Sequence, residues 1–330
     1  MNILVTGAAG YIGSVCAEFL VSRGISVIAL DSLLEGHRPA VPPGAIFCQV
    51  DLGNRPQIES VFTQHKIDAV MHFAAEALVA KSVSEPSIFY ATNVAGGVNL
   101  LDAVTRHGIK KFIFSSTAAT YGEPEIVPIP EDHRKVPINP YGKSKLVFEQ
   151  ILADYKLYTG LNYVCLRYFN AAGATRDRGE HHRVETHLIP RVLDAAGGGL
   201  PHVDVFGTDY PTPDGTCVRD YIHVLDIADS HVRALEQIER VSGEAFNVGN
   251  SRGFSILEVI DVAERITGRK IPRKLGPRRP GDPAVLVASK EKLKRALGWE
   301  ASHSSLEEII QSAWAWKQRY PRGYTDAASA

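Results

Sequence analysis

The fold is decided by the stretch Asn2-Ile-Leu-Val-Thr-Gly-Ala-Ala-Gly-Tyr-Ile-Gly-Ser14. Its first five residues form a mainly apolar run, which is typical of a strand buried on both faces of a parallel sheet. Gly7, Gly10 and Gly13 come next and lead into a helical pattern that ends at Gly24. Glycines at this spacing permit a tight turn and a close approach of the backbone to a pyrophosphate at the helix N-terminus. The stretch therefore predicts a dinucleotide-binding turn between a strand and a helix.

The strand that follows favours NAD over its phosphorylated form. Residues 26–30 form a second apolar run, and Asp31 follows it, eighteen positions after Gly13. A carboxylate at this place binds the hydroxyls of the adenosine ribose and disfavours a 2′-phosphate. The alternative is an incidental acidic residue in an ordinary strand–helix–strand unit.

Strands and helices continue to alternate along the first half of the chain. Apolar runs at residues 45–50, 68–73 and 111–115 are separated by helical patterns. This alternation predicts an α/β fold with a doubly wound parallel Rossmann sheet, in which ligands bind at the carboxyl ends of the strands.

The regular alternation stops after Phe169, which divides the chain. We predict an NAD-binding Rossmann domain over residues 1–169 and a smaller C-terminal α/β lobe, mainly for the substrate, over residues 170–330. An amphipathic helical pattern opened by an acid predicts a segment near 223–240 that returns to the first domain.

Composition excludes several classes of protein. The formal net charge of −1 gives no overall field that would attract nucleic acid or a membrane surface. No apolar run approaches the length of a membrane span, and the first strand begins too early for a signal peptide. The four cysteines contain no C-x-x-C pair, so we expect no disulfide and no zinc site built on cysteine. These features indicate a cytoplasmic protein.

Candidate chemistry lies at Tyr141-Gly-Lys-Ser-Lys145. On a helix, Tyr141 and Lys145 share one face. A phenol is a poor base at its ordinary pKa of about 10, but a nearby ammonium and a nicotinamide cation favour the phenolate. Tyr141 is therefore a candidate acid/base, although this spacing also arises by chance on helix surfaces. The small hydroxyls of Ser115-Ser116-Thr117 could hydrogen-bond a substrate hydroxyl and Tyr141, or could simply end a strand.

Histidines in the second half raise the question of a metal site. His181, His182 and His187 follow or lie within a loop rich in glycine, arginine and acidic residues. They show no carboxylate–histidine spacing of a known site, so we expect no metal. A basic cluster over residues 269–279 is expected to be mostly a solvated charged face.

These features together resemble the extended short-chain dehydrogenase/reductases. The glycine motif, Asp31, residues 115–117 and Tyr141-x-x-x-Lys145 carry that resemblance. Longer motifs are similar to those of the UDP-glucose 4-epimerase family, and they are Leu166-Arg-Tyr-Phe-Asn170, Glu185-Thr-His-Leu-Ile-Pro190, residues 206–223 and Arg278-Arg-Pro-Gly-Asp282. The match runs from about residue 2 to residue 318. It implies NAD as cofactor, a UDP-sugar as substrate and a homodimer formed through helices around 94–104 and 146–155.

The resemblance also implies roles for individual residues. The catalytic residues would be Thr117, Tyr141 and Lys145. Contacts to NAD would come from Gly7, Gly10, Tyr11, Ile12, Gly13, Asp31, Ser32, Leu33, Gly36, Asp51, Leu52, Phe73, Ala74, Ala75, Asn93, Ser115, Tyr141, Lys145 and Phe169. Contacts to the nucleotide sugar would come from Thr117, Tyr141, Asn170, His187, Leu188, Asp204, Val205, Phe206, Arg219, Arg279, Asp282 and Leu286. Of these, Arg219 and Arg279 suit a diphosphate, because guanidinium groups bind phosphate oxygens directionally.

The chain departs from the family pattern at two positions. Some members place a lysine on the cofactor pyrophosphate where this chain has Ala77. The position that gates N-acetylated sugars, four residues after Asp282, is Leu286, which is intermediate between the aromatic and small residues found there. Tolerance of N-acetylated sugars stays open.

The activity implied is the interconversion of UDP-galactose and UDP-glucose through transient oxidation at C4, with Tyr141 as acid/base. A 4-epimerase acting on UDP-GlcNAc, a UDP-pentose or a UDP-uronic acid is the main alternative. A 4,6-dehydratase is disfavoured because Ala118-Ala119 supply no carboxylate after Thr117. A non-catalytic NAD-binding protein is disfavoured because the tyrosine and lysine are both present.

Overall fold

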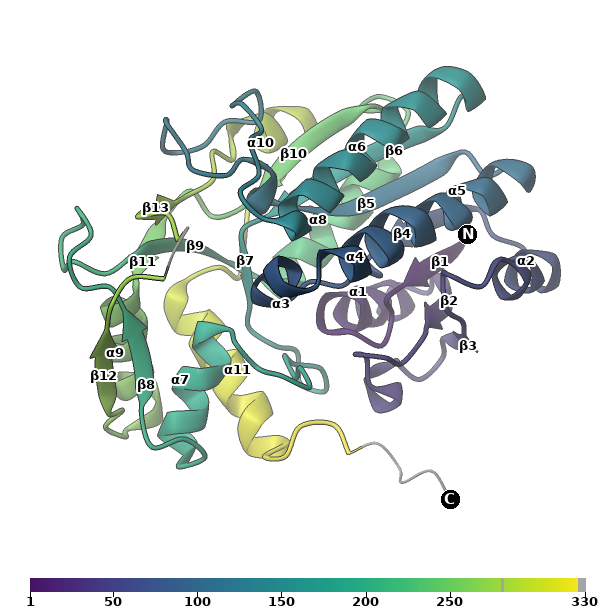
Figure 1. The fold of residues 1–330 in the computed structure, drawn as a ribbon. Helices are drawn as coiled ribbons and strands as arrows, with labels where there is room; N and C mark the ends of the chain where they lie inside the picture. The colour runs from purple at the N-terminus through teal and green to yellow at the C-terminus, as the bar shows by residue number, and fades with distance from the viewer. Residues whose placement is uncertain (280–281, 326–330) are drawn as a thin grey trace.

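The computed structural model describes residues 1–279 and 282–325, which form two lobes (Figure 1). The larger lobe contains a parallel sheet of seven strands in the order β10-β6-β5-β4-β1-β2-β3. These strands are β1 (Asn2–Thr6), β2 (Ser26–Asp31), β3 (Ile46–Gln49), β4 (Ala69–His72), β5 (Lys111–Thr117), β6 (Asn162–Tyr168) and β10 (Glu244–Val248). The predicted α/β class with a doubly wound parallel sheet is confirmed.

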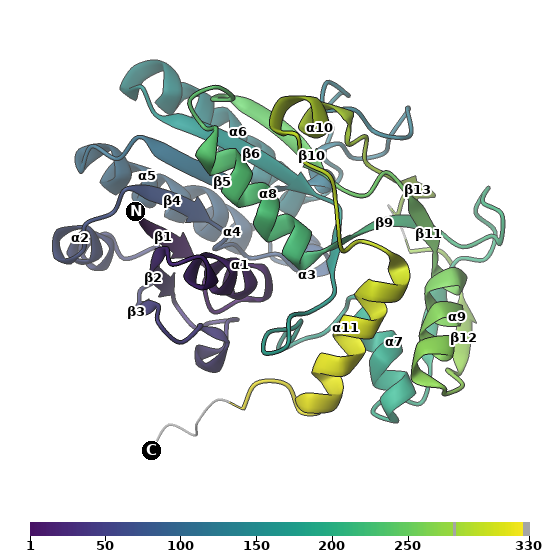
Figure 2. The same ribbon diagram turned by 180° about the vertical axis from the view of Figure 1, so that it is seen from behind.

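Helices cover both faces of this sheet, as the two opposite views show (Figures 1 and 2). They are α1 (Tyr11–Ser22), α2 (Arg55–Gln64), α3 (Val79–Ser84), α4 (Pro86–Phe89), the π-helical turn η2 (Tyr90–Gly96), α5 (Gly97–Arg106), α6 (Pro140–Thr159), α8 (Val224–Glu236) and α10 (Glu291–Leu297). Two short 3₁₀ turns, η1 (Arg38–Ala40) and η3 (Ala118–Thr120), follow β2 and β5.

Alternating residues of the strands fill two separate cores. Ile3 and Val5 of β1 point into the core shared with α1 and α8, whereas Leu4 points into the core shared with α5 and α6. All three side chains are fully buried. This double burial explains why the strands are continuous apolar runs in the sequence.

The smaller lobe pairs two small sheets with three helices. One sheet joins β11 (Gly253–Ser255), β9 (Val218–His223) and β13 (Val285–Leu286), with β7 (Asn170–Ala172) also paired to β9; the other joins β12 (Arg273–Gly276) to β8 (Val203–Phe206). The helices are α7 (Leu188–Gly197), α9 (Ile256–Thr267) and α11 (Leu306–Arg319). Gly198 ends α7 in the left-handed conformation, and a Ser255–Glu258 capping box begins α9.

The chain returns to the larger lobe further than the sequence indicated. The helix predicted near 223–240 is α8, and β10 after it pairs in parallel with β6 as an edge strand of the large sheet. The pattern of β10 was missed because its five residues include Glu244 and Asn247. Leu293 and Leu297 of α10 also lie in the core of the larger lobe.

Among the described residues, none of the helices has both the length and the apolar character needed to cross a bilayer. All four cysteines are free thiols. Residues 280–281 of the Arg278–Asp282 motif, and residues 326–330 at the end of the chain, lie outside the described residues.

Candidate active site

The turn after β1 is so tight that only glycine fits at two of its positions. Gly7 has a φ of +70°, and a Cβ atom there would lie 2.6 Å from the backbone nitrogen of Ala74. A Cβ atom on Gly13 would lie 2.1 Å from the carbonyl oxygen of Gly7. Helix α1 begins after Gly10 with no side-chain cap and no acidic residue in its first turn. Its N-terminus is therefore open to an anion.

Asp31 is fixed at the end of β2. Its carboxylate accepts hydrogen bonds from the backbone N–H of Ala9 (2.9 Å) and of Leu33 (2.8 Å), and the residue is only 7% exposed. Burial raises the pKa of Asp31, while these hydrogen bonds oppose the rise. Leu33 adopts a φ of +63°, which is strained for a leucine, and Gly36 passes so close that a Cβ atom would lie 2.9 Å from the Asp31 carboxylate. The loop over residues 32–36 is thus wrapped around this carboxylate.

Other predicted cofactor contacts follow β3 and β4. Asp51 and Leu52 come one residue after the end of β3, and Phe73, Ala74 and Ala75 come directly after β4. The Phe73 ring stacks on His231 of α8 at 4.6 Å between centroids. The amide group of Asn93 is occupied: it donates to Glu76 O and Ser144 Oγ, both at 3.0 Å, and accepts from Glu76 N. Asn93 therefore holds the segment after β4 against α6.

Tyr141 and Lys145 are brought to the end of β5 by the first turns of α6. The side chain of Asn139 caps this helix by accepting from Gly142 N at 2.8 Å. A Cβ atom on Gly142 would lie 2.4 Å from Ala119 O, so only glycine lets α6 approach η3 this closely. The Tyr141 hydroxyl is hydrogen-bonded to Thr117, and the amino group of Lys145 donates to Ser115 O at 2.9 Å. The three predicted catalytic residues thus meet at one place.

The hydroxyls of Ser115 and Ser116, which could either meet the substrate and Tyr141 or simply end the strand, have other partners in this structure. The side chain of Ser115 is hydrogen-bonded to Tyr168. Ser116 points to the opposite face of the strand, where it donates to Glu149 at 2.5 Å. Because side chains alternate along β5, those of Ser115 and Thr117 share one face of the strand and that of Ser116 lies on the other.

The electrostatics differ from the prediction that the Lys145 ammonium would lower the pKa of Tyr141. Burial raises the pKa of Tyr141, and the hydrogen bond with Thr117 only opposes this. Burial lowers the pKa of Lys145 to about 7, although Glu149 acts in the other direction. The Lys145 amino group faces the Ser115 carbonyl and lies 4.9 Å from the centre of the Phe114 ring. In this structure desolvation outweighs attraction for both groups.

A buried polar network behind β5 was not predicted. Arg167 of β6 is 2% exposed and forms two hydrogen bonds with the carboxylate of Glu149 on α6, at 2.6 and 2.9 Å. It also donates to Tyr121, whose hydroxyl donates to Asn247 of β10. An arginine inside an otherwise apolar strand must find a partner, and this was the available signal. The network ties α6 to three strands of the sheet.

The predicted diphosphate ligands lie in the smaller lobe. Arg219 on β9 is 8% exposed, and its guanidinium is paired with Asp282 and donates to Val218 O. The guanidinium of Arg279 lies 3.9 Å from the centre of the Phe206 ring. The side chain of Val205 is fully buried in the core, so the predicted contact of this residue with the nucleotide sugar would come from its backbone. Asp204 and Phe206 alternate with it and point away from that core.

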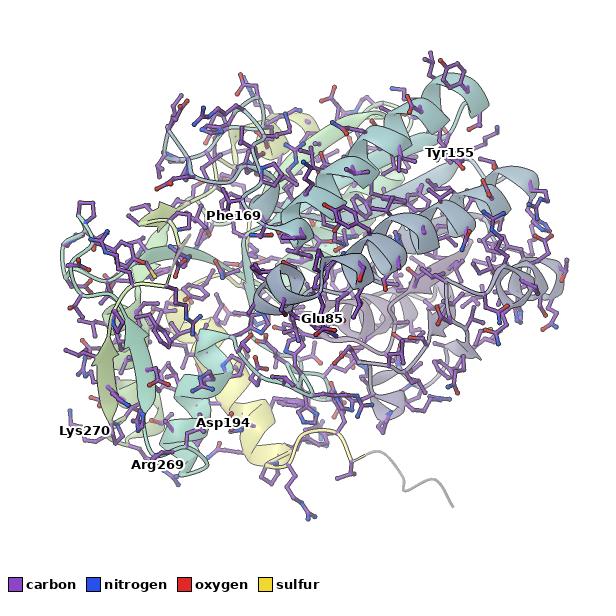
Figure 3. All side chains as sticks on the ribbon, viewed as in Figure 1. Glu85, Tyr155, Phe169, Asp194, Arg269 and Lys270 are labelled. Carbon is purple, nitrogen blue, oxygen red and sulfur yellow. The ribbon has the colours of Figure 1, made fainter. Side chains whose placement is uncertain are left out.

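The rest of the basic cluster is engaged locally. Lys270 pairs with Glu264, Arg273 with Asp261, and Arg278 with Asp209. Arg269 and Lys270 lie at the outer edge of the smaller lobe, far from Phe169, which lies between the lobes (Figure 3). These ion pairs agree with the prediction that the basic cluster is mostly a solvated charged face.

Leu286 lies close to the catalytic residues. It packs, together with Phe169, against a small apolar cluster formed by Ala118, Tyr121 and Ile129. Ala118 is the neighbour of Thr117, so the side chain of Leu286 borders the space beside the catalytic threonine. Asn170, on the short strand β7, continues directly from Phe169.

The segment between β7 and α7, residues 173–187, crosses from one lobe to the other and is called the crossing loop below. Gly173 O accepts a hydrogen bond from the Tyr11 hydroxyl at 2.6 Å. Arg183 donates to the carbonyl oxygens of Leu33, Leu34 and Gly36 in the loop around Asp31. At its end, His187 Nδ1 lies 2.8 Å from Glu185 and 3.1 Å from Glu180. Burial would lower the pKa of His187, but the two carboxylates raise it to about 9.

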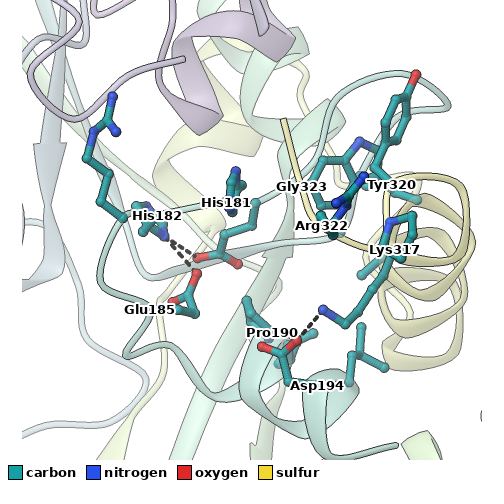
Figure 4. Close-up of a pocket in the computed structure, with 18 residues that line it drawn as sticks. His181, His182, Glu185, Pro190, Asp194, Lys317, Tyr320, Arg322 and Gly323 are labelled. Carbon is teal, nitrogen blue, oxygen red and sulfur yellow. Dashed lines mark hydrogen bonds and ion pairs between the residues drawn. The ribbon is translucent and has the colours of Figure 1, made fainter. Parts of the chain in front are cut away.

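A cavity of about 300 Å³ lies beside the crossing loop, against α7 and α11 (Figure 4). Its wall includes His182, Glu185, Asp194 and Lys317, of which the last two form an ion pair. It contains none of the three catalytic residues.

Known proteins resemble the chain over its whole length. The model of the NAD dependent epimerase/dehydratase family matches residues 3–249. The UDP-glucose 4-epimerase of Lacticaseibacillus casei is 46% identical over 329 residues, which are 99% of each chain. The chain belongs to the NAD dependent epimerase/dehydratase family.

Solved structures agree with this assignment. UDP-glucose 4-epimerase from Brucella ovis, in complex with NAD, is 45% identical, and the match has a TM-score of 0.91 and covers 95% of this chain and 97% of that one. The enzyme from Bifidobacterium longum, in complex with NAD⁺ and UDP, is 37% identical, with a TM-score of 0.93 and coverage of 98% and 100%.

The residues of this family member fit a bound NAD. The turn over Gly7–Gly13 is a cradle that Cβ atoms would fill, and α1 offers its uncapped N-terminus to phosphate. Asp31 is buried and oriented at the place where an adenosine ribose binds in such folds. The hydroxyl of Tyr11, a predicted NAD contact, is already engaged, because it donates a hydrogen bond to Gly173 O.

Proposed function

We propose that the protein is an NAD-dependent UDP-glucose 4-epimerase, which interconverts UDP-galactose and UDP-glucose. One observation carries this proposal: Tyr141 is hydrogen-bonded to Thr117 and stands one helical turn before Lys145. The full-length similarity to UDP-glucose 4-epimerases supports the same substrate. The site residues are assigned on this basis.

The chain's own groups would handle the proton and hold the substrate. Tyr141 Oη accepts the proton of the sugar C4 hydroxyl, and the Thr117 hydroxyl hydrogen-bonds to that sugar oxygen. When bound, NAD supplies reversible oxidation at C4. Arg219 and Arg279 bind the diphosphate, so the nucleotide stays held while the hexose presents its other face. Lys145 lies one helical turn after Tyr141 on α6, and its amino group donates to Ser115 O.

The proton on Tyr141 must be labile for this scheme. Burial raises the pKa of Tyr141 in the protein chain alone. A positive charge placed beside the phenol lowers its pKa. We infer that the oxidised nicotinamide ring, which is cationic, supplies the charge that Lys145 by itself does not.

Three further assignments belong to this proposal. NAD binding is assigned to residues 1–169 with the returning segment, here α8 and β10, and nucleotide-sugar binding mainly to the remainder. The homodimer is assigned to the outer faces of α5 and α6, which no other helix covers in Figure 1 and on which Leu157 and Tyr158 are 73% and 80% exposed. Four free thiols agree with a reducing compartment, the cytoplasm.

Replacing Tyr141 by phenylalanine tests the proposal. We expect kcat to fall by about 10²–10⁴, because the acid/base is lost, while UDP binding is unchanged. The matched control is Tyr155→Phe on the same helix, whose hydroxyl donates to Asp102 at 2.7 Å near the far end of α6 (Figure 3). Initial rates with UDP-galactose and calorimetry with UDP give both quantities. Equal activity of the two variants would contradict the assignment of Tyr141.

A further inference from the structure

Four side chains of the crossing loop converge on one point. Glu180, His182, Glu185 and His187 each offer one nitrogen or oxygen atom, and these atoms lie within 4.8 Å of one another. The spacing is Glu-x-His-x-x-Glu-x-His, which brings two imidazoles and two carboxylates together from eight consecutive residues. The sequence predicted no metal, because these histidines show no carboxylate–histidine spacing of a known site. The structure adds the two carboxylates.

The geometry points to a site for a divalent transition-metal ion, for which we propose Zn²⁺. Both histidines direct Nδ1 toward the same two carboxylates. His187 Nδ1 lies 2.8 Å from Glu185 and 3.1 Å from Glu180, and His182 Nδ1 lies 2.9 Å from Glu185 and 3.6 Å from Glu180. Bonds of about 2.0–2.1 Å in a tetrahedron place neighbouring ligand atoms about 3.4 Å apart. The two histidines reach different oxygens of Glu185, and one ligand atom from each of the four residues lies within 4.8 Å of the others, so the side chains must move inward to share one ion.

Charge and burial suit a cation. Two carboxylates and two neutral imidazoles carry a charge of −2, which one divalent ion neutralises. The side chain of Glu180 is 8% exposed and that of Glu185 is 18% exposed, so both carboxylates need a positive charge beside them, which a metal ion would supply in place of the protons on the two histidines. The mixture of imidazole and carboxylate ligands is one that Zn²⁺ accepts.

The site would be structural rather than catalytic. Four protein ligands close a tetrahedral coordination shell and leave no position for a reactive water. Figure 4 shows His182 and Glu185 at the wall of the cavity, and the catalytic tyrosine is not among the residues that line it. The ion would fasten the crossing loop, which carries Arg183 to the loop around Asp31 and ends at the N-terminus of α7. With Nδ1 of His187 on the metal, its Nε2 stays available to a nucleotide sugar.

Metal binding can be measured directly on the untagged protein. The chain is treated with a chelator, dialysed, and titrated with Zn²⁺ in competition with a chromophoric chelator. We expect one tightly bound equivalent and a rise in the melting temperature that the chelator reverses. Co²⁺ added in place of Zn²⁺ should give the intense visible absorption of a tetrahedral complex.

Variants separate this site from adventitious binding. His182→Asn and Glu185→Gln each remove a ligand, and we expect the Zn²⁺ affinity to fall by about 100-fold or more. His202→Asn is the matched control, because His202 is partly exposed and faces Asp204 elsewhere in the smaller lobe. Should the ligand variants fold poorly, the Co²⁺ spectrum of the unaltered chain decides the matter alone. Weak, substoichiometric binding, or a spectrum without tetrahedral bands, would show that protons alone hold the cluster and would overturn the proposal. These readouts do not depend on epimerase activity.

Discussion

At the scale of single residues, the site depends on close approaches that only certain side chains permit. Gly142 brings α6 to η3, and Tyr141 thereby reaches Thr117. His231 of α8 packs against the predicted NAD contact Phe73, on whose ring it stacks. Its Nε2 accepts a hydrogen bond from the Tyr168 hydroxyl at 2.6 Å, and its Nδ1 donates one to Ile227 O. These bonds require the neutral imidazole.

The burial of His231 predicts a pH-dependent stability. Burial lowers its pKa to about 4, from an ordinary value of 6.5. Between these values the unfolded chain binds a proton that the folded chain does not, so the free energy of unfolding falls as the pH falls from 6.5 to 4. A difference of this size corresponds to about 3 kcal/mol.

Substitution by glutamine isolates the contribution of this histidine. The glutamine of His231→Gln keeps an acceptor for Tyr168 but does not titrate. As the pH falls over this range, the unaltered chain should therefore lose about 1–3 kcal/mol more of its free energy of unfolding than the variant does. Urea unfolding at pH 6.5 and at pH 4.5 measures both. An unchanged pH dependence in the variant would show that the proton binds elsewhere.

The residue-level predictions from the sequence succeeded where a motif is local. The glycine turn and the Tyr141–Lys145 pair could be predicted because a few neighbouring residues determine the backbone there. The roles of Ser115, Ser116 and Val205 could not, because they depend on which face of a strand each side chain occupies. The balance at Tyr141 between burial and the Lys145 ammonium could not be predicted either, because burial is a property of the whole fold.

At the scale of elements, the crossing loop connects the two binding regions. Arg183 donates to the carbonyl oxygens of Leu34 at 2.9 Å and of Leu33 and Gly36 at 3.4 Å. These carbonyls belong to the loop that surrounds Asp31. The contacts join residues about 150 positions apart, so no pattern within the sequence could have indicated them.

We expect Arg183 to contribute to the retention of NAD. Arg183→Ala removes charge-assisted hydrogen bonds at a partly exposed position, and the fraction of protein that keeps NAD through extensive dialysis should fall about 3- to 10-fold. The NAD released by acid is quantified by chromatography. Arg176→Ala is the control, since Arg176 lies in the same loop with its side chain exposed. Equal NAD content in the two variants would mean that the crossing loop does not hold the cofactor loop.

At the scale of the whole molecule, two lobes divide the work between cofactor and nucleotide sugar. The order of strands and helices in the larger lobe could be read from the sequence because each buried strand is a continuous apolar run. The smaller lobe has short strands, and its chain returns twice to the larger lobe through β10 and α10. Such long-range pairings leave little trace in the local pattern.

The outer faces of α5 and α6 predict the assembly of the molecule. If these faces pair about a twofold axis, light scattering after size exclusion should give about twice the chain mass of 36.0 kDa. Leu157→Glu with Tyr158→Glu should shift the protein toward the single-chain mass, because it places charge on an apolar contact. Val184→Glu, at an exposed position of the crossing loop, is the control. A single-chain mass for the unaltered protein would contradict the dimer.

The most direct test of the central claim is to incubate the purified protein with UDP-galactose and no added cofactor. We predict that UDP-glucose forms until the two sugars reach equilibrium, with no net NADH, because the oxidation at C4 is reversed on the same bound NAD. Conversion of UDP-GlcNAc or a UDP-pentose instead would keep the chemistry and change the substrate. Leu286 occupies the position that gates N-acetylated sugars in the family. No conversion of any of these sugars, even with NAD⁺ supplied, would contradict the account.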